Sequence, residues 1–152
     1  MVTIQLDLPA PPPETAVHEN KNLILDPFRR KWLVHTPEEW VRQWVLKSLV
    51  INNGFPAARI ATEIPAKYHR LKKRSDALLY DEFGRCLMLM EFKASSVNID
   101  ENTMHQALTY NAFFKAPNIL LSNGKTHLLR KISPSLSWLE CLPMYHELAP
   151  CV

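Results

Sequence analysis

The sequence predicts an α/β domain in which helices flank a mixed central sheet. Three observations support this class. A strongly capped helix begins at Thr36, and two apolar strands surround a turn at Phe83-Gly84. A second helix then precedes two short strands joined by Asn123-Gly124. The resulting order of helix, three strands, helix and strand pair is typical of an α/β sandwich.

The composition is that of one globular domain. The 152 residues are 47% hydrophobic and 22% charged, which leaves room for one core. A net charge of only +3 does not by itself indicate a nucleic-acid partner. The three cysteines are scattered, without zinc-site spacing, and indicate reduced thiols in a cytoplasmic protein. We expect no signal peptide and no membrane contact, since no apolar run approaches the roughly 20 residues that span a bilayer.

The chain divides into three predicted parts. Residues 1–22 are rich in proline and predict an extended arm outside the core. We expect this arm to pack on its own domain or on a partner subunit, which would give a homo-oligomer. Residues 23–132 form the predicted core, and residues 133–152 form a C-terminal extension with an extra strand from Ser137 to Leu142.

The first helix has clear start and stop signals. Thr36 is its N-cap, Pro37 suits the first helical position, and Glu39 completes a capping box. An apolar stripe follows at Val41, Val45 and Leu49. Asn53-Gly54 then ends the helix.

Three strands follow this helix. The first is expected from Arg59 to Pro65, and two more near residues 75–81 and 86–93 form a hairpin with its tip at Phe83-Gly84. Residues 86–90 are all apolar, which indicates a central strand covered on both faces.

The tip sets the register of this hairpin. It pairs Asp81 with Cys86, and counting back places Asp76 opposite Glu91. Directly opposed residues share a face, with Cβ atoms about 5 Å apart. Lys93 is two residues beyond Glu91 and lies on the same face. Two carboxylates and a lysine therefore converge at the end of an otherwise apolar hairpin.

This convergence indicates a metal site. Two facing carboxylates repel each other unless a cation lies between them, and Mg²⁺ accepts a few carboxylate oxygens while keeping several waters. We expect Mg²⁺, with Mn²⁺ able to substitute, and Lys93 would orient or polarise a metal-bound water. The alternative is a surface ion pair of Lys93 with Glu91 or Asp76, and the spacing alone leaves both interpretations open.

The last predicted elements are a helix and two strands. Asp100 is the expected N-cap of a helix that runs to about Lys115. Strands from Asn118 to Ser122 and from Lys125 to Lys131 surround the tight turn at Asn123-Gly124.

These motifs resemble a known family. An aspartate that begins one hairpin strand and a Glu-x-Lys that ends the next resemble the PD-(D/E)XK nuclease superfamily. In wider context the chain is similar to the N-terminal nuclease domain of the type I restriction enzyme R subunit, in a short stand-alone form, over roughly residues 23–131. The segments that carry this resemblance are Leu25 to Val34, Thr36 to Gln43, Arg74 to Asp76, Glu91 to Ala94, Gln106 to Asn111 and Ser122 to Gly124. Ser75 stands where the superfamily name has a proline, and Phe92 stands where a small residue or cysteine is frequent.

The resemblance implies a restriction-endonuclease-like core and a Mg²⁺-dependent endodeoxyribonuclease. Asp76, Glu91 and the backbone carbonyl of Phe92 would hold the metal, and Lys93 would position the attacking water. Glu39, on the first helix, would reach the metal directly or through water. The sequence also allows Glu39 only to complete the capping box.

Two groups of residues are expected to contact DNA. Gln106 and Tyr110 share one helix face and resemble the Gln-x-x-x-Tyr pair with which RecB-like nucleases contact DNA; they would otherwise be a polar helix flank. A basic stretch without an acid leads into the strand of Asp76, and its candidate DNA contacts are Arg70, Lys72, Lys73 and Arg74. A phosphate backbone bound at the metal would pass close to it, whereas the ordinary interpretation is a solvated loop.

The sequence also bears on partners and on a rival function. It lacks a Gly-x-x-x-x-Gly-Lys-Ser/Thr motif, so an ATP-driven step would need a separate motor subunit, and we also consider a separate specificity subunit. The rival is a non-catalytic DNA-binding or assembly module on the same fold. The intact Asp76, Glu91 and Lys93 favour the nuclease, whereas the proline-rich arm favours assembly.

Overall fold

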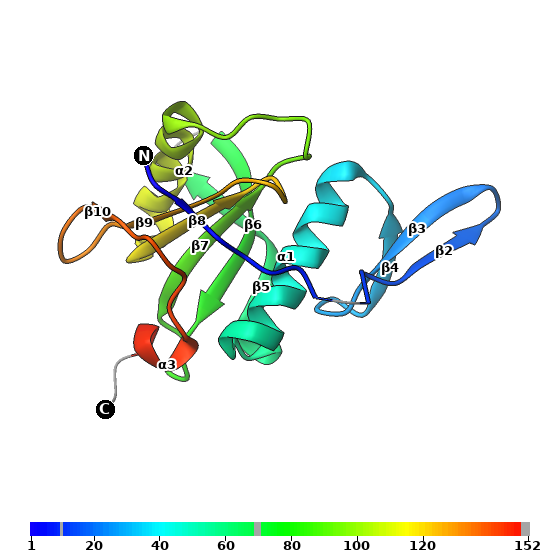
Figure 1. The fold of residues 1–152 in the computed structure, drawn as a ribbon, viewed down its shortest axis with the longest axis horizontal. Coiled ribbons are helices and arrows are strands. Elements are labelled where there is room, and N and C mark those ends of the chain that lie inside the picture. Colours follow the sequence, from blue (N-terminus) through cyan, green and yellow to red (C-terminus); the bar gives the residue numbers. More distant parts are fainter. Residues whose placement is uncertain (10, 69–70, 150–152) are drawn as a thin grey trace.

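The computed structural model describes residues 1–9, 11–68 and 71–149. Within these residues the main sheet has seven strands, in the order β1-β9-β8-β7-β6-β5 with β10 beside β9 (Figure 1). Strands β7 and β8 are parallel and the other neighbours are antiparallel, so the sheet is mixed, as predicted. The bounds of its strands are β1 (Thr3–Ile4), β5 (Ile60–Tyr68), β6 (Leu71–Tyr80), β7 (Cys86–Phe92), β8 (Asn118–Ser122), β9 (His127–Lys131) and β10 (Ser137–Trp138).

Two long helices cover opposite faces of this sheet, α1 (Pro37–Asn53) and α2 (Glu101–Phe114) (Figure 1). The core on the α1 side includes Val41, Val45, Leu49, Ala77, Leu79, Met88 and Met90. The core on the α2 side includes Leu78, Leu89, Met104, Ala107, Ile119 and Leu121. Successive residues of β6 and β7 thus alternate between two apolar layers. Burial of each such large side chain stabilises the fold by roughly 1.5–3 kcal/mol relative to exposure.

The helix caps follow the sequence signals. Thr36 Oγ1 accepts a hydrogen bond from the backbone N–H of Glu39 at 3.1 Å, and Gly54 ends α1 with a φ of 68°. At α2, Asp100 Oδ1 accepts from the Thr103 N–H at 3.0 Å, and Thr103 Oγ1 accepts from the Asp100 N–H at 3.3 Å. Both helices are therefore fixed at the predicted starting residues.

The hairpin of β6 and β7 has the predicted register away from its tip. Ala77 is opposite Met90, and counting one residue further in this register places Asp76 opposite Glu91. At the tip, however, Tyr80 pairs with Cys86, so the predicted pairing of Asp81 with Cys86 is wrong.

The Asp81 side chain explains this difference. Its Oδ1 accepts from the Arg85 N–H at 2.8 Å, and the Asp81 N–H donates to the Arg85 carbonyl at 2.9 Å. Asp81 is therefore part of the turn, and a β-bulge between Leu79 and Tyr80 restores the register. The two deviations cancel before the strand reaches Asp76.

The basic stretch is a strand extension, so its interpretation as a loop is wrong. Strands β5 and β6 continue pairing to Tyr68 and Leu71, with Lys67 opposite Lys72 and Ala66 opposite Lys73. Neither residues 66–68 nor residues 71–73 contain a glycine or proline, which is consistent with the pairing of these two segments. Arg70 lies outside the described residues.

The proline-rich N-terminal segment packs on its own domain, which is one of the two expected arrangements, but it also contributes to the core, contrary to the prediction of an arm outside it. Strand β1 pairs with β9, and Ile4 is buried. Leu6 and Leu8 pack against the α1-side core, so alternating apolar residues carried a strand signal before the prolines. The segment then follows α1, whose Ser48 hydroxyl and Trp44 indole donate to the carbonyls of Asp7 and Pro9 at 2.8 and 2.9 Å.

A second, three-stranded antiparallel sheet was not predicted. It has the order β2-β3-β4 and projects from the side of α1 (Figure 1). Its strands are β2 (Thr15–His18), β3 (Lys21–Asp26) and β4 (Lys31–Val34). Ile24 is fully buried, whereas three large apolar side chains of the sheet are exposed, Val17, Trp32 and Val34.

The remaining elements are short. The predicted strand from Ser137 to Leu142 is only β10, although the Leu139 N–H donates to the Leu129 carbonyl at 2.9 Å. A 3-10 turn, η1 (Ala57–Arg59), precedes β5, and a C-terminal helix, α3 (Tyr145–Leu148), was not predicted. Among the described residues, no helix is long and apolar enough to cross a membrane.

Candidate active site

Strands β6 and β7 bring Asp76 and Glu91 together at one end of the sheet. Asp76 Oδ2 accepts a hydrogen bond from the backbone N–H of Phe92 at 2.7 Å, which fixes this carboxylate across the strand pair. Glu91 is only 8% exposed, and its buried Oε1 has no hydrogen-bond partner among the described residues. A buried carboxylate oxygen without a protein partner is costly, and its chemistry suits a cation or a hydrogen-bond donor as a ligand.

Both carboxyl groups hold their protons unusually tightly. Burial, followed by the nearby charge of Asp76, raises the pKa of Glu91 to about 8. Burial also raises the pKa of Asp76, although the Phe92 N–H and the Arg42 charge oppose this shift. Without a cation, the pair therefore disfavours full ionisation at neutral pH.

Lys93 lies directly after β7. Its backbone N–H donates to the Ser122 carbonyl at 2.9 Å, which ties the end of this strand to β8. Its positive charge lowers the pKa of both Asp76 and Glu91. Lys93 makes no close ion pair with either acid in the described part of the chain, which removes support for the interpretation as a simple salt bridge.

Glu39 belongs to a separate group in which both of its own carboxylate oxygens are paired, although Arg42 Nε and Gln43 Oε1 are buried without a partner among the described residues. Its Oε1 accepts from Gln43 Nε2 at 2.8 Å, and its Oε2 pairs with Arg42 Nη2 at 2.8 Å. Its side chain does not return to the Thr36 N–H, so only the Thr36 half of the predicted capping box is present. Residues three and four positions apart share a helix face, which is why these side chains meet.

Arg42 joins this helix to the sheet. It is only 4% exposed, and its Nη1 donates to Glu63 Oε1 at 2.5 Å. Burial disfavours its charge, but the Glu63 hydrogen bond and the charges of Glu39 and Asp76 leave the pKa of Arg42 raised. Sequence reasoning missed Arg42; its spacing from Glu39 and Gln43 was the available signal.

Glu63 meets Arg42 because the backbone of β5 is irregular there. Its φ is 56°, a left-handed conformation that costs a non-glycine residue about 1–3 kcal/mol. The flanking residues Thr62 and Ile64 pair with Ala77 and Ser75, whereas the position opposite Asp76 is missing from the ladder. The irregularity therefore lies directly beside Asp76, as is common for strand irregularities near functional sites.

A family model for the N terminus of the type I restriction enzyme R protein matches residues 37–143. The chain belongs to this family. The match confirms the resemblance seen in the sequence and includes α1, α2 and the main-sheet strands from β5 onward. The N-terminal segment and the sheet β2-β3-β4 lie before it. A comparison with curated proteins gives no match.

The residues predicted to contact DNA all lie within the family match, but they lie on different elements and differ in exposure. Gln106 is exposed on α2, and Tyr110 is half-buried one turn further along. Arg74 is exposed and lies 3.9 Å from Glu63, next to the candidate site. Lys72 and Lys73 lie near the start of β6 at Leu71, at the end away from the turn to β7, and Arg70 lies outside the described residues.

The donor set limits how a metal would bind to this family member. Within the described residues, no group of three or more His, Cys, Asp or Glu side chains is arranged to hold a metal ion. Asp76 and Glu91 form a group of two, with an unpartnered oxygen on Glu91. These residues fit a divalent cation that completes its coordination with a backbone carbonyl and water, as Mg²⁺ commonly does.

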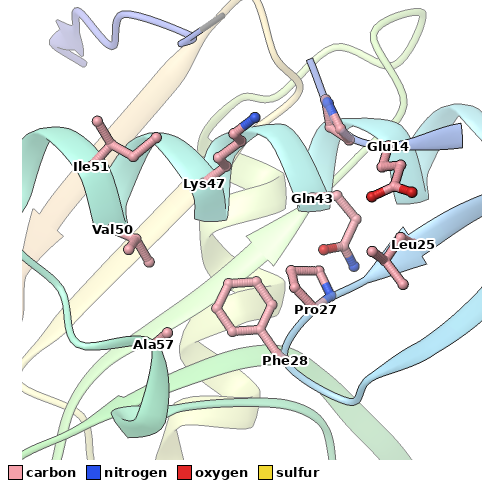
Figure 2. A pocket seen from close by; sticks show the side chains of 10 residues that line it. Glu14, Leu25, Pro27, Phe28, Gln43, Lys47, Val50, Ile51 and Ala57 are labelled. Atoms are coloured by element: carbon pink, nitrogen blue, oxygen red, sulfur yellow. The ribbon is translucent and has the colours of Figure 1, made fainter. Parts of the chain in front are cut away.

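A separate pocket lies between α1 and the sheet β2-β3-β4 (Figure 2). Its volume is about 400 Å³, and its mostly apolar walls include Leu25, Pro27, Phe28 and Val50. Figure 2 shows the Gln43 side chain reaching from α1 toward Pro27. Gln43 also bonds to Glu39, but the described residues that line this pocket do not include Asp76 or Glu91.

Proposed function

We propose that the chain is a divalent-metal-dependent endodeoxyribonuclease with a restriction-endonuclease-like core. The observation that carries this proposal is the buried pair Asp76 and Glu91, with a carboxylate oxygen that lacks a partner. Membership of the type I restriction enzyme R N-terminal family supports a restriction-related DNA context. Mg²⁺ is the proposed cofactor, and Mn²⁺ should substitute for it.

The bound cation would be held by Asp76, Glu91 and the carbonyl of Phe92. When bound, it would lower the pKa of a coordinated water and neutralise charge on the scissile phosphate. The chain's own residues prepare this chemistry. The Phe92 N–H fixes the Asp76 carboxylate, and the Lys93 ammonium would orient the attacking water or hold a phosphate oxygen.

Substrate binding would use residues beside this pair. Arg74, Lys72 and Lys73 lead along β6 to Asp76, so a phosphate backbone bound there would follow the strand. Gln106 and Tyr110 on α2 would orient the DNA strand, and Arg70 would add a further phosphate contact. A separate motor or specificity subunit remains a proposed partner, as does a second copy of this chain through the N-terminal segment.

A cleavage assay with matched variants tests this function. Circular and linear DNA are incubated with Mg²⁺, Mn²⁺ or a chelator, beside Asp76→Ala and the control Glu82→Gln. Glu82 is exposed in the hairpin turn, so its substitution should leave cleavage unchanged. Cleavage should require the metal and Asp76. A metal-dependent DNA complex without cleavage would instead support the non-catalytic module.

A further inference from the structure

We infer that Arg42 is a positioning residue that limits the candidate site to one divalent cation, held by Asp76 and Glu91, by keeping Glu39 and Glu63 as non-ligands. This inference rests on the proposed metal-dependent function. It goes further by stating how many cations bind and which of the acids Glu39, Glu63, Asp76 and Glu91 contact them.

The contacts of Arg42 occupy the oxygens that a second cation would need. Glu39 uses both carboxylate oxygens, one on Arg42 and one on Gln43, each at 2.8 Å. Glu63 directs Oε1 to Arg42 at 2.5 Å, and its Oε2 lies 3.9 Å from Arg74. The guanidinium therefore already acts as the cation for two of the four acids.

The backbone indicates that this arrangement is built into the fold. Strict alternation along β5 would place Ile64 on the same side as Ile60 and Thr62. The left-handed Glu63 breaks the alternation, so Ile64 packs against the α2-side core while Glu63 meets Arg42 on α1. A strained residue persists where the surrounding contacts require it, and here the contact is the Arg42 ion pair.

The charges around the site support one cation. Asp76 interacts electrostatically with the charged side chains of Arg42, Glu38 and Lys93. With Arg74 included, the neighbourhood contains three cationic side chains, Arg42, Arg74 and Lys93, and five acids, Glu38, Glu39, Glu63, Asp76 and Glu91. Full ionisation leaves a deficit of two positive charges, which one divalent cation neutralises.

The first test counts Mn²⁺ on the full-length chain by calorimetry and by electron paramagnetic resonance. Wild type should bind one Mn²⁺ per chain. Asp76→Asn and Glu91→Gln should weaken binding by more than the roughly 100-fold that changes outside the coordination sphere reach. Glu39→Gln and Glu63→Gln should weaken it by about tenfold or less. These variants keep Arg42 and compare four acids by the same kind of substitution.

The second test changes Arg42 itself. Arg42→Met should allow a second Mn²⁺ to bind, because Glu39 and Glu63 lose their cation. Arg42→Lys keeps the charge but not the fork that reaches both acids, so it should lower stability and still remain at one Mn²⁺ per chain. A merely structural arginine would change stability in both variants without changing the number of bound cations. If Arg42→Met does not fold, the comparison of the four acids still decides the inference.

Besides an Arg42→Met variant that folds and still binds one Mn²⁺, three outcomes would overturn the inference. Two Mn²⁺ ions per wild-type chain, both lost with Glu91→Gln, would show that Arg42 does not limit the site. A loss of affinity with Glu39→Gln or Glu63→Gln as large as with Glu91→Gln would make those acids ligands. Both results would still be compatible with a metal-dependent nuclease. The third outcome, absence of Mn²⁺ binding to wild type, would contradict the proposed function as well.

Discussion

Two pairs of acids lie side by side in this molecule and differ in how their charge is balanced. Glu39 and Glu63 share the buried Arg42, and all three are joined by short ion pairs. Asp76 and Glu91 face each other, no close ion pair joins either of them to a basic side chain within the described residues, and burial raises the pKa of both. The first pair thus has the character of a structural link between α1 and the sheet, and the second that of a pair of carboxylates suited to bind a cation.

The largest expected effect is on cleavage through the second pair. Asp76→Ala or Glu91→Ala should abolish metal-dependent DNA cleavage, because either change removes a proposed ligand. Folding should be retained or improved, since the remaining carboxylate loses a repelling neighbour. Cleavage rates and thermal unfolding of the same metal-free preparations check both parts. Near wild-type cleavage by Asp76→Ala would end the metal-site assignment.

Lys93→Met separates the chemistry of this pair from metal binding. Methionine keeps much of the stem and removes the ammonium, so cleavage should fall by orders of magnitude, as electrostatic groups at such sites contribute a few kcal/mol. Mn²⁺ affinity should not fall, because a positive neighbour is removed from beside the cation. Single-turnover cleavage and Mn²⁺ titration on the same variant measure these effects. Unchanged cleavage would assign Lys93 to an ordinary surface charge.

Removing a charge from the group of Glu39, Glu63 and Arg42 should destabilise the fold, whereas removing Asp76 or Glu91 should not. Arg42→Met leaves the buried Glu39 and the half-buried Glu63 without their cation and should lower the free energy of unfolding by about 3–5 kcal/mol. Replacing Arg42, Glu39 and Glu63 together with Met, Gln and Gln should recover most of this loss. Denaturant unfolding of both variants in chelator provides the measurement. Equal destabilisation in the single and triple variants would contradict a charge-pairing role.

The contrast between the pairs also explains what the sequence could and could not predict. Asp76 and Glu91 were predictable because strand pairing is periodic, and the bulge beside Tyr80 compensated the wrong tip. The link from Arg42 to Glu63 was not predictable, because it depends on a left-handed glutamate. Such a conformation has a sequence signal when glycine or asparagine adopts it, and glutamate gives none.

The N-terminal segment was mispredicted for a different physical reason. Its prolines indicated an extended chain correctly, but extended chain without its own hydrogen-bond ladder can still be held by another element. Side chains of α1 supply donors to its carbonyls, including Ser48 and Asn52 to Asp7. Ile4 then completes the sheet edge beside β9. These partners lie about 40 residues or more away in sequence, where local patterns carry no information.

The pH dependence of stability sharpens the comparison further. A carboxyl whose folded pKa is raised contributes stability below its unfolded pKa and loses it as pH rises through the folded pKa. For Glu91 this window runs from about 4.5 to about 8. Metal-free wild type should therefore lose a few kcal/mol at most across it, and Glu91→Gln should lose less. Denaturant unfolding in chelator at several pH values measures the difference, with Glu82→Gln as the exposed control. A pH dependence unchanged by Glu91→Gln would place the titrating group elsewhere.

The smallest expected effect concerns charges outside both pairs. Lys72 and Lys73 lie on the extension of β6, so their joint replacement by alanine should weaken DNA binding without altering single-turnover cleavage at saturating DNA. Each duplex phosphate contact that is lost should reduce the slope of log K against log salt concentration by about 0.9. Replacing Lys21 and Lys31, exposed on the sheet before the family match, removes the same charge and provides the control. A reduced slope in the β6 variant alone would place the DNA backbone along the strand that ends at the unpaired acids. Equal slopes in both variants would show that DNA senses only the overall charge, and the path along β6 would have to be abandoned.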